Sequence, residues 1–168
     1  MDQPKTILLN HKQAMQRINR IAYQIYEDNA SEKELIVAGI LSSGYEVAKL
    51  LSEVLQEITP FKIHLLEVKL DKHSQVASAI KLSLESSLLP GKSIVLVDDV
   101  LNSGKTMMYA LKPFLESDIK KIRTVVLVDR NHRRYPIAAD YVGLSLATTM
   151  QEHVTVEFGN QEINAFLS

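Results

Sequence analysis

Three short apolar runs constrain the fold of this 168-residue chain more than any other feature. They occupy residues 35–40, 94–97 and 124–128, and most of their side chains are β-branched or leucine. Continuous runs of this kind are typical of strands that are buried on both faces of a parallel sheet. Because helical patterns separate them, we predict an α/β fold with a mainly parallel, twisted sheet and helices on both faces.

The segments between these runs carry the apolar spacing of helices and the alternation of further strands. The helical stripes are Met15, Ile18, Ala22 and Ile25; Val47, Leu50, Leu51 and Val54; and Met107, Met108, Leu111, Phe114 and Leu115. Residues 62–70 and the alternating Ile80, Leu82 and Leu84 predict two more strands, with a polar loop at 71–78 between them. Short segments follow around 141–143 and 154–156.

Composition limits the classes of function. The hydrophobic fraction is 46% and the formal net charge is −1, so we expect one globular domain with no overall basic field for nucleic acid or membrane. The absence of cysteine excludes disulfides, thiolate catalysis and cysteine-bound metals. No long apolar stretch predicts a signal peptide or a membrane span, and we expect a cytoplasmic protein.

Ligands of parallel α/β sheets bind beyond the carboxyl ends of the strands. Three candidate loops lie there, at residues 41–44, 98–106 and 129–134. The second is the most informative, since it follows the clearest buried strand and reads DDVLNSGKT.

Residues 102–106 of this loop have the features of a phosphate cradle. Gly104 allows backbone N–H groups to turn inward, and Ser103 and Thr106 add hydroxyl donors. A helix beginning near Lys105 would point its positive end at the same place. The segment is not a Walker loop, because Asp99 occupies the position of the first glycine.

The two acids before the cradle need a different role, because they would repel a phosphate. Asp98 and Asp99 could accept hydrogen bonds from adjacent sugar hydroxyls, or hold Mg²⁺ through water. Together with the cradle, they predict a ribose 5-phosphate site. In the plain structural alternative, Asp99 only caps a turn and the Ser-Gly-Lys-Thr run begins a helix.

The residues just described resemble a known family. The segment 95–106 resembles the phosphoribosyl-pyrophosphate (PRPP) motif of type I phosphoribosyltransferases. Residues 126–143 look like the C-terminal segment of the pyrimidine-operon attenuator / uracil phosphoribosyltransferase family, and residues 17–22 are similar to its first helix. The resemblance implies a single phosphoribosyltransferase domain over residues 1–168, with a core at about 30–145 and a small hood from the N- and C-terminal segments.

The resemblance also implies a reaction, in which PRPP and a nucleobase give a nucleotide and pyrophosphate with Mg²⁺ as cofactor. Uracil is the base that the resemblance favours. By this resemblance Asp98, Asp99 and Asn102 would be catalytic, and the two acids would also bind the ribose and hold the metal. The residues expected to bind PRPP are Asp98, Asp99, Val100, Leu101, Asn102, Ser103, Gly104, Lys105 and Thr106. Pyrophosphate would be bound by Leu41, Ser42, Ser43 and Gly44, with a non-proline cis peptide, and the base by Asp129, Arg130 and Val142. It implies a homodimer or larger homo-oligomer.

Several departures from the family keep two alternatives open. The 41–44 loop lacks the arginines that the family has there, and the family's Arg-Asp-Asp sequence is missing near residues 70–74. Both departures favour a regulator that senses PRPP or a nucleotide, binds RNA and has little or no catalytic activity. Ser43-Gly44-Tyr45 is closer to hypoxanthine phosphoribosyltransferases. Those enzymes, however, have an acid at position 102 and a lysine at position 129, where this chain has Asn102 and Asp129.

The remaining polar residues carry weaker hypotheses. His132, Arg133 and Arg134 could contact RNA together with Lys12, Arg17 and Arg20, but we interpret the run as a solvated loop or a subunit contact. We interpret His73 as exposed rather than as a lid residue, and we reject Glu152 and His153 as a metal pair because strand neighbours point to opposite faces. Arg130 could serve the base, the pyrophosphate or a nearby acid.

Overall fold

The structure is a computed structural model that describes residues 4–70 and 80–168, in two sheets with helices between and around them. Its elements are β1 (Thr6–Leu9), α1 (His11–Asp28), β2 (Glu34–Ile40), α2 (Ser43–Ile58), β3 (Lys62–Lys69), β4 (Lys81–Leu82), a short 3₁₀ helix (Ser86–Leu88), β5 (Ser93–Leu101), α3 (Lys105–Ala110), α4 (Lys112–Leu115), β6 (Lys121–Asp129), β7 (Tyr141–Ser145), β8 (Val154–Gly159) and β9 (Glu162–Leu167). The predictions for residues 71–78 and for His73 lie outside the described residues.

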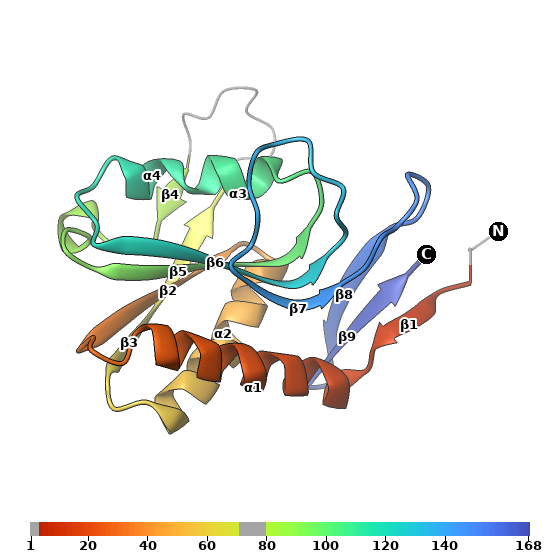
Figure 1. Cartoon of the computed structure of the whole chain (residues 1–168), viewed down its shortest axis with the longest axis horizontal. Helices are drawn as coiled ribbons and strands as arrows, with labels where there is room; N and C mark the ends of the chain where they lie inside the picture. The colour runs from red at the N-terminus through yellow and green to blue at the C-terminus, as the bar shows by residue number, and fades with distance from the viewer. Residues whose placement is uncertain (1–3, 71–79) are drawn as a thin grey trace.

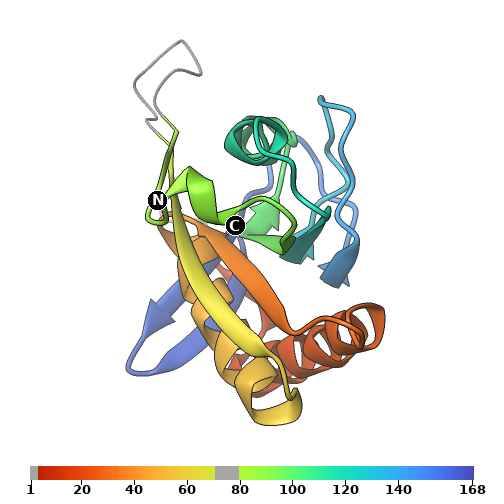
Figure 2. The ribbon, with the colours of Figure 1, turned by 90° about the vertical axis from the view of Figure 1, so that its left-hand side faces the viewer.

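The main sheet has six strands in the order β4-β3-β2-β5-β6-β7. All of its pairs are parallel except β3 with β4. Helices α1 and α2 cover one face, and α3 and α4 cover the other (Figure 1 and Figure 2). The predicted α/β architecture, with a mainly parallel sheet and helices on both faces, is therefore confirmed.

The apolar runs are continuous because the central strands contribute to a core on each face. Successive side chains of a strand point to opposite faces. Val37 and Val95 thus pack into the core under α1 and α2, whereas Ile36 and Leu96 pack into the core under α3 and α4, together with Phe114. Both faces need apolar side chains, so the period-two alternation of a half-exposed strand is absent.

Two elements differ from the sequence prediction. The expected single helix after Thr106 is two short helices, α3 and α4, because Pro113 lies in the first turn of α4 and has no N–H to continue the ladder. Leu115, predicted on its apolar stripe, is exposed. The expected strand at 80–84 is limited to β4, which pairs with β3 only through Leu82 and Lys81.

The second sheet joins the two ends of the chain. Strand β9 lies between β1 and β8, and both of its pairs are antiparallel. Figure 1 shows this sheet beside the first turns of α1, at the β7 end of the molecule. It is built from the segments that the predicted hood would use, although the division into core and hood stays a prediction. Within the described residues, no helix combines the length and apolarity that a membrane span requires.

A buried tyrosine links α1 to the main sheet. The hydroxyl of Tyr141 on β7 donates to the carboxylate of Asp28, the last residue of α1. Burial, and then the hydrogen bond to Asp28, raises the pKa of Tyr141 well above its usual range. A raised pKa in the folded state means that this stabilisation is complete below the unfolded pKa of about 10 and is lost as the pH rises above it.

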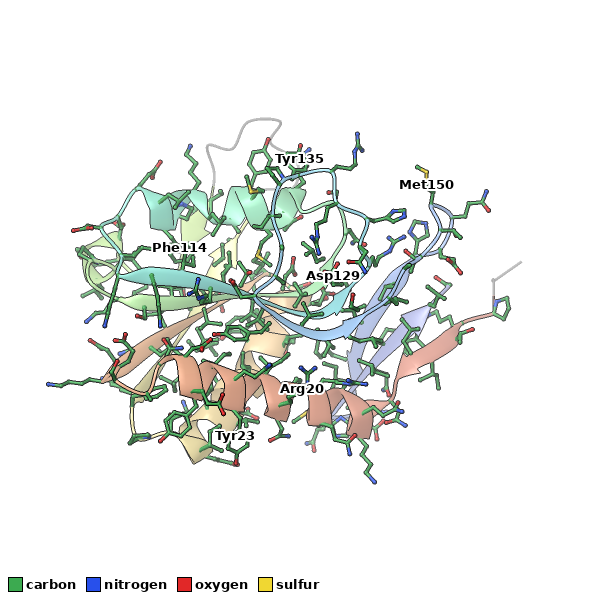
Figure 3. All side chains as sticks on the ribbon, viewed as in Figure 1. Arg20, Tyr23, Phe114, Asp129, Tyr135 and Met150 are labelled. Atoms are coloured by element: carbon green, nitrogen blue, oxygen red, sulfur yellow. The ribbon has the colours of Figure 1, made fainter. Side chains whose placement is uncertain are left out.

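We expect Tyr141→Phe to lower the free energy of unfolding by about 1 kcal/mol at pH 8, the value of a typical net hydrogen bond. The difference from wild type should shrink as the pH rises above about 10, since only the wild type then pays for the suppressed ionisation. Urea titrations from pH 7 to 11 measure both effects. Tyr23→Phe is the matched control, because Tyr23 lies on α1 with its ring pointing away from the sheet (Figure 3). A constant difference across this range would contradict the linkage.

Candidate functional site

The order of the strands identifies the edge where a ligand would bind. From β2 the chain proceeds outward to β3 on one side, and later to β5 and β6 on the other. The switch therefore lies between β2 and β5, and crevices at the carboxyl ends of such strands are the usual ligand sites of open α/β sheets. Two of the three predicted loops lie there: residues 41–44 after β2, and residues 102–106, the part of the predicted 98–106 loop that follows β5. We call residues 102–106 the phosphate loop and residues 41–44 the β2–α2 turn.

The β2–α2 turn packs directly against the acids of β5. A Cβ placed on Gly44 would lie 2.8 Å from Oδ1 of Asp98 and 2.9 Å from the carbonyl oxygen of Val97. Only a residue without a side chain allows this approach. The peptide bond between Leu41 and Ser42 is cis, as the family resemblance implied, and the N–H of Leu41 donates to the carbonyl of Val68 at 3.0 Å.

The acids themselves lie inside β5, which continues beyond the predicted strand end to Leu101 because it pairs with β6 up to Leu101 and Asp129. Both are partly buried. Oδ1 of Asp98 accepts the N–H of Asp99 at 2.9 Å, and Oδ1 of Asp99 accepts the N–H of Val100 at 2.8 Å. Asp99 thus lies within a strand and not in a turn, whereas the Ser-Gly-Lys-Thr run does begin a helix, α3, at Lys105, as in the structural alternative.

The phosphate loop is shaped by Gly104, whose φ of 84° lies in the left-handed region that glycine favours. A Cβ at this position would also lie 2.6 Å from Cγ2 of Ile137. The carbonyl of Ser103 accepts the N–H groups of Arg134 and Tyr135 at 2.8 and 3.0 Å. The loop after β6 therefore packs against the phosphate loop and is hydrogen-bonded to it. Nζ of Lys105 lies 5.9 Å from the ring centroid of Tyr109, along α3.

Arg130 connects the phosphate loop to a segment far along the chain. Its backbone N–H donates to Leu101, and its guanidinium donates to Oδ1 of Asn102 at 2.9 Å. The other acceptors belong to residues 148–152: Thr148 Oγ1 at 3.0 Å, the Thr149 carbonyl at 3.3 Å and the Glu152 carbonyl. All four side-chain contacts go to uncharged oxygens. We call residues 148–152 the clamp loop.

The other predicted base-binding residues lie on the neighbouring strand ends. Asp129 is the buried last residue of β6, and its carboxylate accepts the N–H of Asn131 at 2.8 Å and a guanidinium N–H of Arg133 at 2.9 Å. Val142 lies on β7, beside β6, and its carbonyl accepts from Arg20 of α1 at 3.0 Å. Asp129 thus lies at the end of β6, and Arg20 contacts the neighbouring strand β7 from helix α1 (Figure 3).

These contacts change the interpretation of the basic run. Arg130 is buried, Arg133 is paired with Asp129, and Arg20 donates to the carbonyls of Val142 and Gly143. Two of the arginines considered for an RNA surface, Arg133 and Arg20, are therefore engaged within the chain. Arg134 is exposed.

The clamp loop is the part of the site that the sequence did not indicate. Thr148 and Thr149 show no periodicity and follow no buried strand directly, and Glu152 was considered only as part of a rejected metal pair. The one available signal was Arg130, a large cation placed just after a buried strand, which needs several acceptors if it is itself buried.

The carboxylates of Asp98 and Asp99 belong to the ligand class that Mg²⁺ prefers, and the two acids are consecutive residues in the second half of β5. Within residues 4–70 and 80–168, no group of three or more His, Asp or Glu side chains is arranged to hold a metal ion. The two acids fit a magnesium ion that is held largely by water and by substrate oxygens.

Comparison with known proteins places the chain among sequences of one family. Residues 5–161 match the family described as the phosphoribosyl transferase domain. The protein named Bifunctional protein PyrR of Actinobacillus pleuropneumoniae (serotype 5b) is 34% identical over 157 residues, which cover 89% of this chain and 88% of the relative. The protein of the same name from Clostridium kluyveri is 34% identical over 160 residues, covering 91% and 90% of the two chains.

Solved structures show the same fold at lower identity. The hypoxanthine phosphoribosyltransferase of Trypanosoma cruzi superposes with a TM-score of 0.74 at 18% identity, and the match covers 95% of both chains. The hypoxanthine phosphoribosyltransferase of Staphylococcus aureus gives a TM-score of 0.71 at 18% identity, covering 86% of this chain and 80% of the other. At this identity the likeness concerns the fold alone.

Proposed function

This chain belongs to the type I phosphoribosyltransferase family, in the group that contains the PyrR proteins, and on that premise we propose that it transfers ribose 5-phosphate from PRPP to uracil. The observation that carries the proposal is the contact between Gly44 and Asp98. It joins a turn suited to pyrophosphate with the acids suited to a ribose diol, beside a loop suited to a 5′-phosphate.

The division of labour follows from the chemistry of each segment. Asp98 and Asp99 would accept hydrogen bonds from the ribose hydroxyls, and the phosphate loop would donate to the 5′-phosphate. The β2–α2 turn would hold pyrophosphate through backbone N–H groups, since it carries no cationic side chain. Positioning and charge stabilisation would supply most of the catalysis, because the anomeric carbon becomes positively charged as pyrophosphate leaves.

Bound Mg²⁺ would neutralise the charge that develops on pyrophosphate. Asp98 and Asp99, in the second half of β5, would hold it through water.

Uracil is the base we propose, for two reasons. Residues 126–143 resemble the uracil-specific group, and the two residues with which the purine enzymes read their base are replaced by Asn102 and Asp129. The buried carboxylate of Asp129 is an acceptor only, so it suits a base N–H and not an exocyclic oxygen.

The decisive experiment mixes the protein with PRPP, Mg²⁺ and one base at a time, and measures pyrophosphate. We expect release with uracil to exceed release with hypoxanthine, guanine or xanthine. Turnover of a purine in preference to uracil would overturn the base assignment. No turnover of any of the four would overturn the enzymatic proposal.

A regulatory function is the second candidate, favoured by the word bifunctional in the relatives' name and by the absence of arginines from the β2–α2 turn. The protein would then use its nucleotide site as a sensor and bind RNA elsewhere. Salt-dependent retardation of a pyrimidine leader RNA would support it. If Arg134→Ala leaves that retardation unchanged, the segment after β6 is not the RNA surface.

A further inference from the structure

Arg130 is an unusual residue for its position, since only 7% of it is exposed. Arginine is almost never this deeply buried unless its charge and donors are satisfied. Here the guanidinium makes four hydrogen bonds, one to the phosphate loop and three to the clamp loop. A single side chain therefore holds two segments that are separated by about 45 residues.

The bond to Asn102 determines which way its amide faces. A guanidinium has donors and no acceptor, so the atom of Asn102 beside it must be the amide oxygen. The two N–H donors of the amide then lie on the far side of that oxygen. Because Asn102 is exposed, these donors are accessible to a ligand at the phosphate loop.

The clamp loop is fixed from within as well as by Arg130. The N–H of Thr149 donates to a carboxylate oxygen of Glu152 at 2.6 Å. This hydrogen bond is the main reason that the pKa of the Glu152 carboxyl is lowered. Between these two residues Met150 is 87% exposed and stands at the tip of the loop (Figure 3). The loop follows β7 and thus begins at the same edge of the sheet as the predicted base-binding residues.

We propose that Arg130 is a positioning residue that turns the amide donors of Asn102 toward an oxygen acceptor of the bound substrate and holds the clamp loop beside the base. This role rests on the proposed function, because it concerns the same PRPP and base sites. The acceptor is an oxygen of PRPP or an exocyclic oxygen of the base. Asn102 then acts as a donor, where the purine enzymes of the family have an acid.

The test is a double-mutant cycle with Asn102→Ala, Arg130→Lys and the double variant. The Kd of PRPP is measured by calorimetry without base, and kcat and KM of uracil are measured separately. Lysine keeps the charge but loses the fork of donors that reaches both segments. We expect each single variant to raise either the Kd of PRPP or the KM of uracil about tenfold, which corresponds to the loss of a hydrogen bond to a charged or oriented group. The change in kcat should be smaller.

The constant that changes identifies the acceptor, since PRPP binding is measured in the absence of base. In the double variant, the affected constant should be no more than about twofold higher than in the single variant with the larger effect. This is expected because Asn102 is useful only when Arg130 orients it. Arg123→Lys is the matched control. Arg123 lies on β6, near the end opposite to the one that Arg130 follows, is exposed, and its substitution should leave every constant unchanged.

Multiplicative effects of the two substitutions, or an unchanged Kd and KM in Asn102→Ala, would overturn the role of Arg130 while the transferase proposal stood. Wild-type protein that turns over no base would instead overturn the proposed function itself. If Arg130→Lys does not fold, Thr148→Val replaces it in the cycle, since it removes one acceptor of the guanidinium and keeps its own shape. A roughly threefold effect that is again non-additive with Asn102→Ala is then expected.

Discussion

Asp99→Asn is expected to weaken PRPP binding by about tenfold to a hundredfold. The carboxylate would accept hydrogen bonds from the ribose hydroxyls, and a hydrogen bond to a charged group contributes about 1.5–3 kcal/mol. Fold and position should survive, because an asparagine oxygen can still accept the N–H of Val100 that Asp99 accepts at 2.8 Å. Calorimetric titration with PRPP and Mg²⁺ measures the loss, and thermal unfolding checks that the melting temperature is retained.

Asp118→Asn is the matched control for this substitution. Asp118 is exposed and precedes β6, at the opposite edge of the sheet from the proposed site. It should bind PRPP like the wild type. An Asp99→Asn protein that also binds PRPP normally would contradict the diol role and would leave the phosphate loop alone to account for affinity.

The sheet could be predicted from sequence because burial on both faces leaves a continuous apolar run. Ile94 and Val95 pack into opposite cores, so both of them must be apolar. The helix after Thr106 was predicted less well, since periodicity registers Leu111 and Phe114 but not the break that Pro113 imposes. Local chemistry there overrides the pattern.

The candidate site divides in the same way. Its loops could be predicted, because chain order places residues 41–44 and 102–106 at the carboxyl ends of adjacent strands. The contacts of Arg130 with Thr148, Thr149 and Glu152 could not, since they depend on where the chain returns after β7. Sequence left three roles open for Arg130, and only its hydrogen bonds distinguish a clamp from an ion pair.

Gly44→Ala is expected to reduce PRPP affinity at least tenfold. The added Cβ would lie 2.9 Å from the Cα of Asp98 and from the carbonyl oxygen of Val97, which are backbone atoms of a central strand and cannot move aside cheaply. Relief must therefore come from the β2–α2 turn, which would shift away from the acids. Overpacking of this kind costs about 1–3 kcal/mol of stability, and it would separate the pyrophosphate and ribose parts of the proposed site.

Gly159→Ala separates this local effect from a general intolerance of alanine. No atom lies within 4 Å of a Cβ placed at Gly159, which ends β8 in the small sheet, so stability should change by about 0.5 kcal/mol or less and PRPP binding should not change. Both proteins can be compared by urea unfolding and by PRPP titration. If Gly44→Ala is destabilised but binds PRPP with wild-type affinity, the close contact between Gly44 and Asp98 serves packing alone, and the turn does not hold pyrophosphate beside the acids.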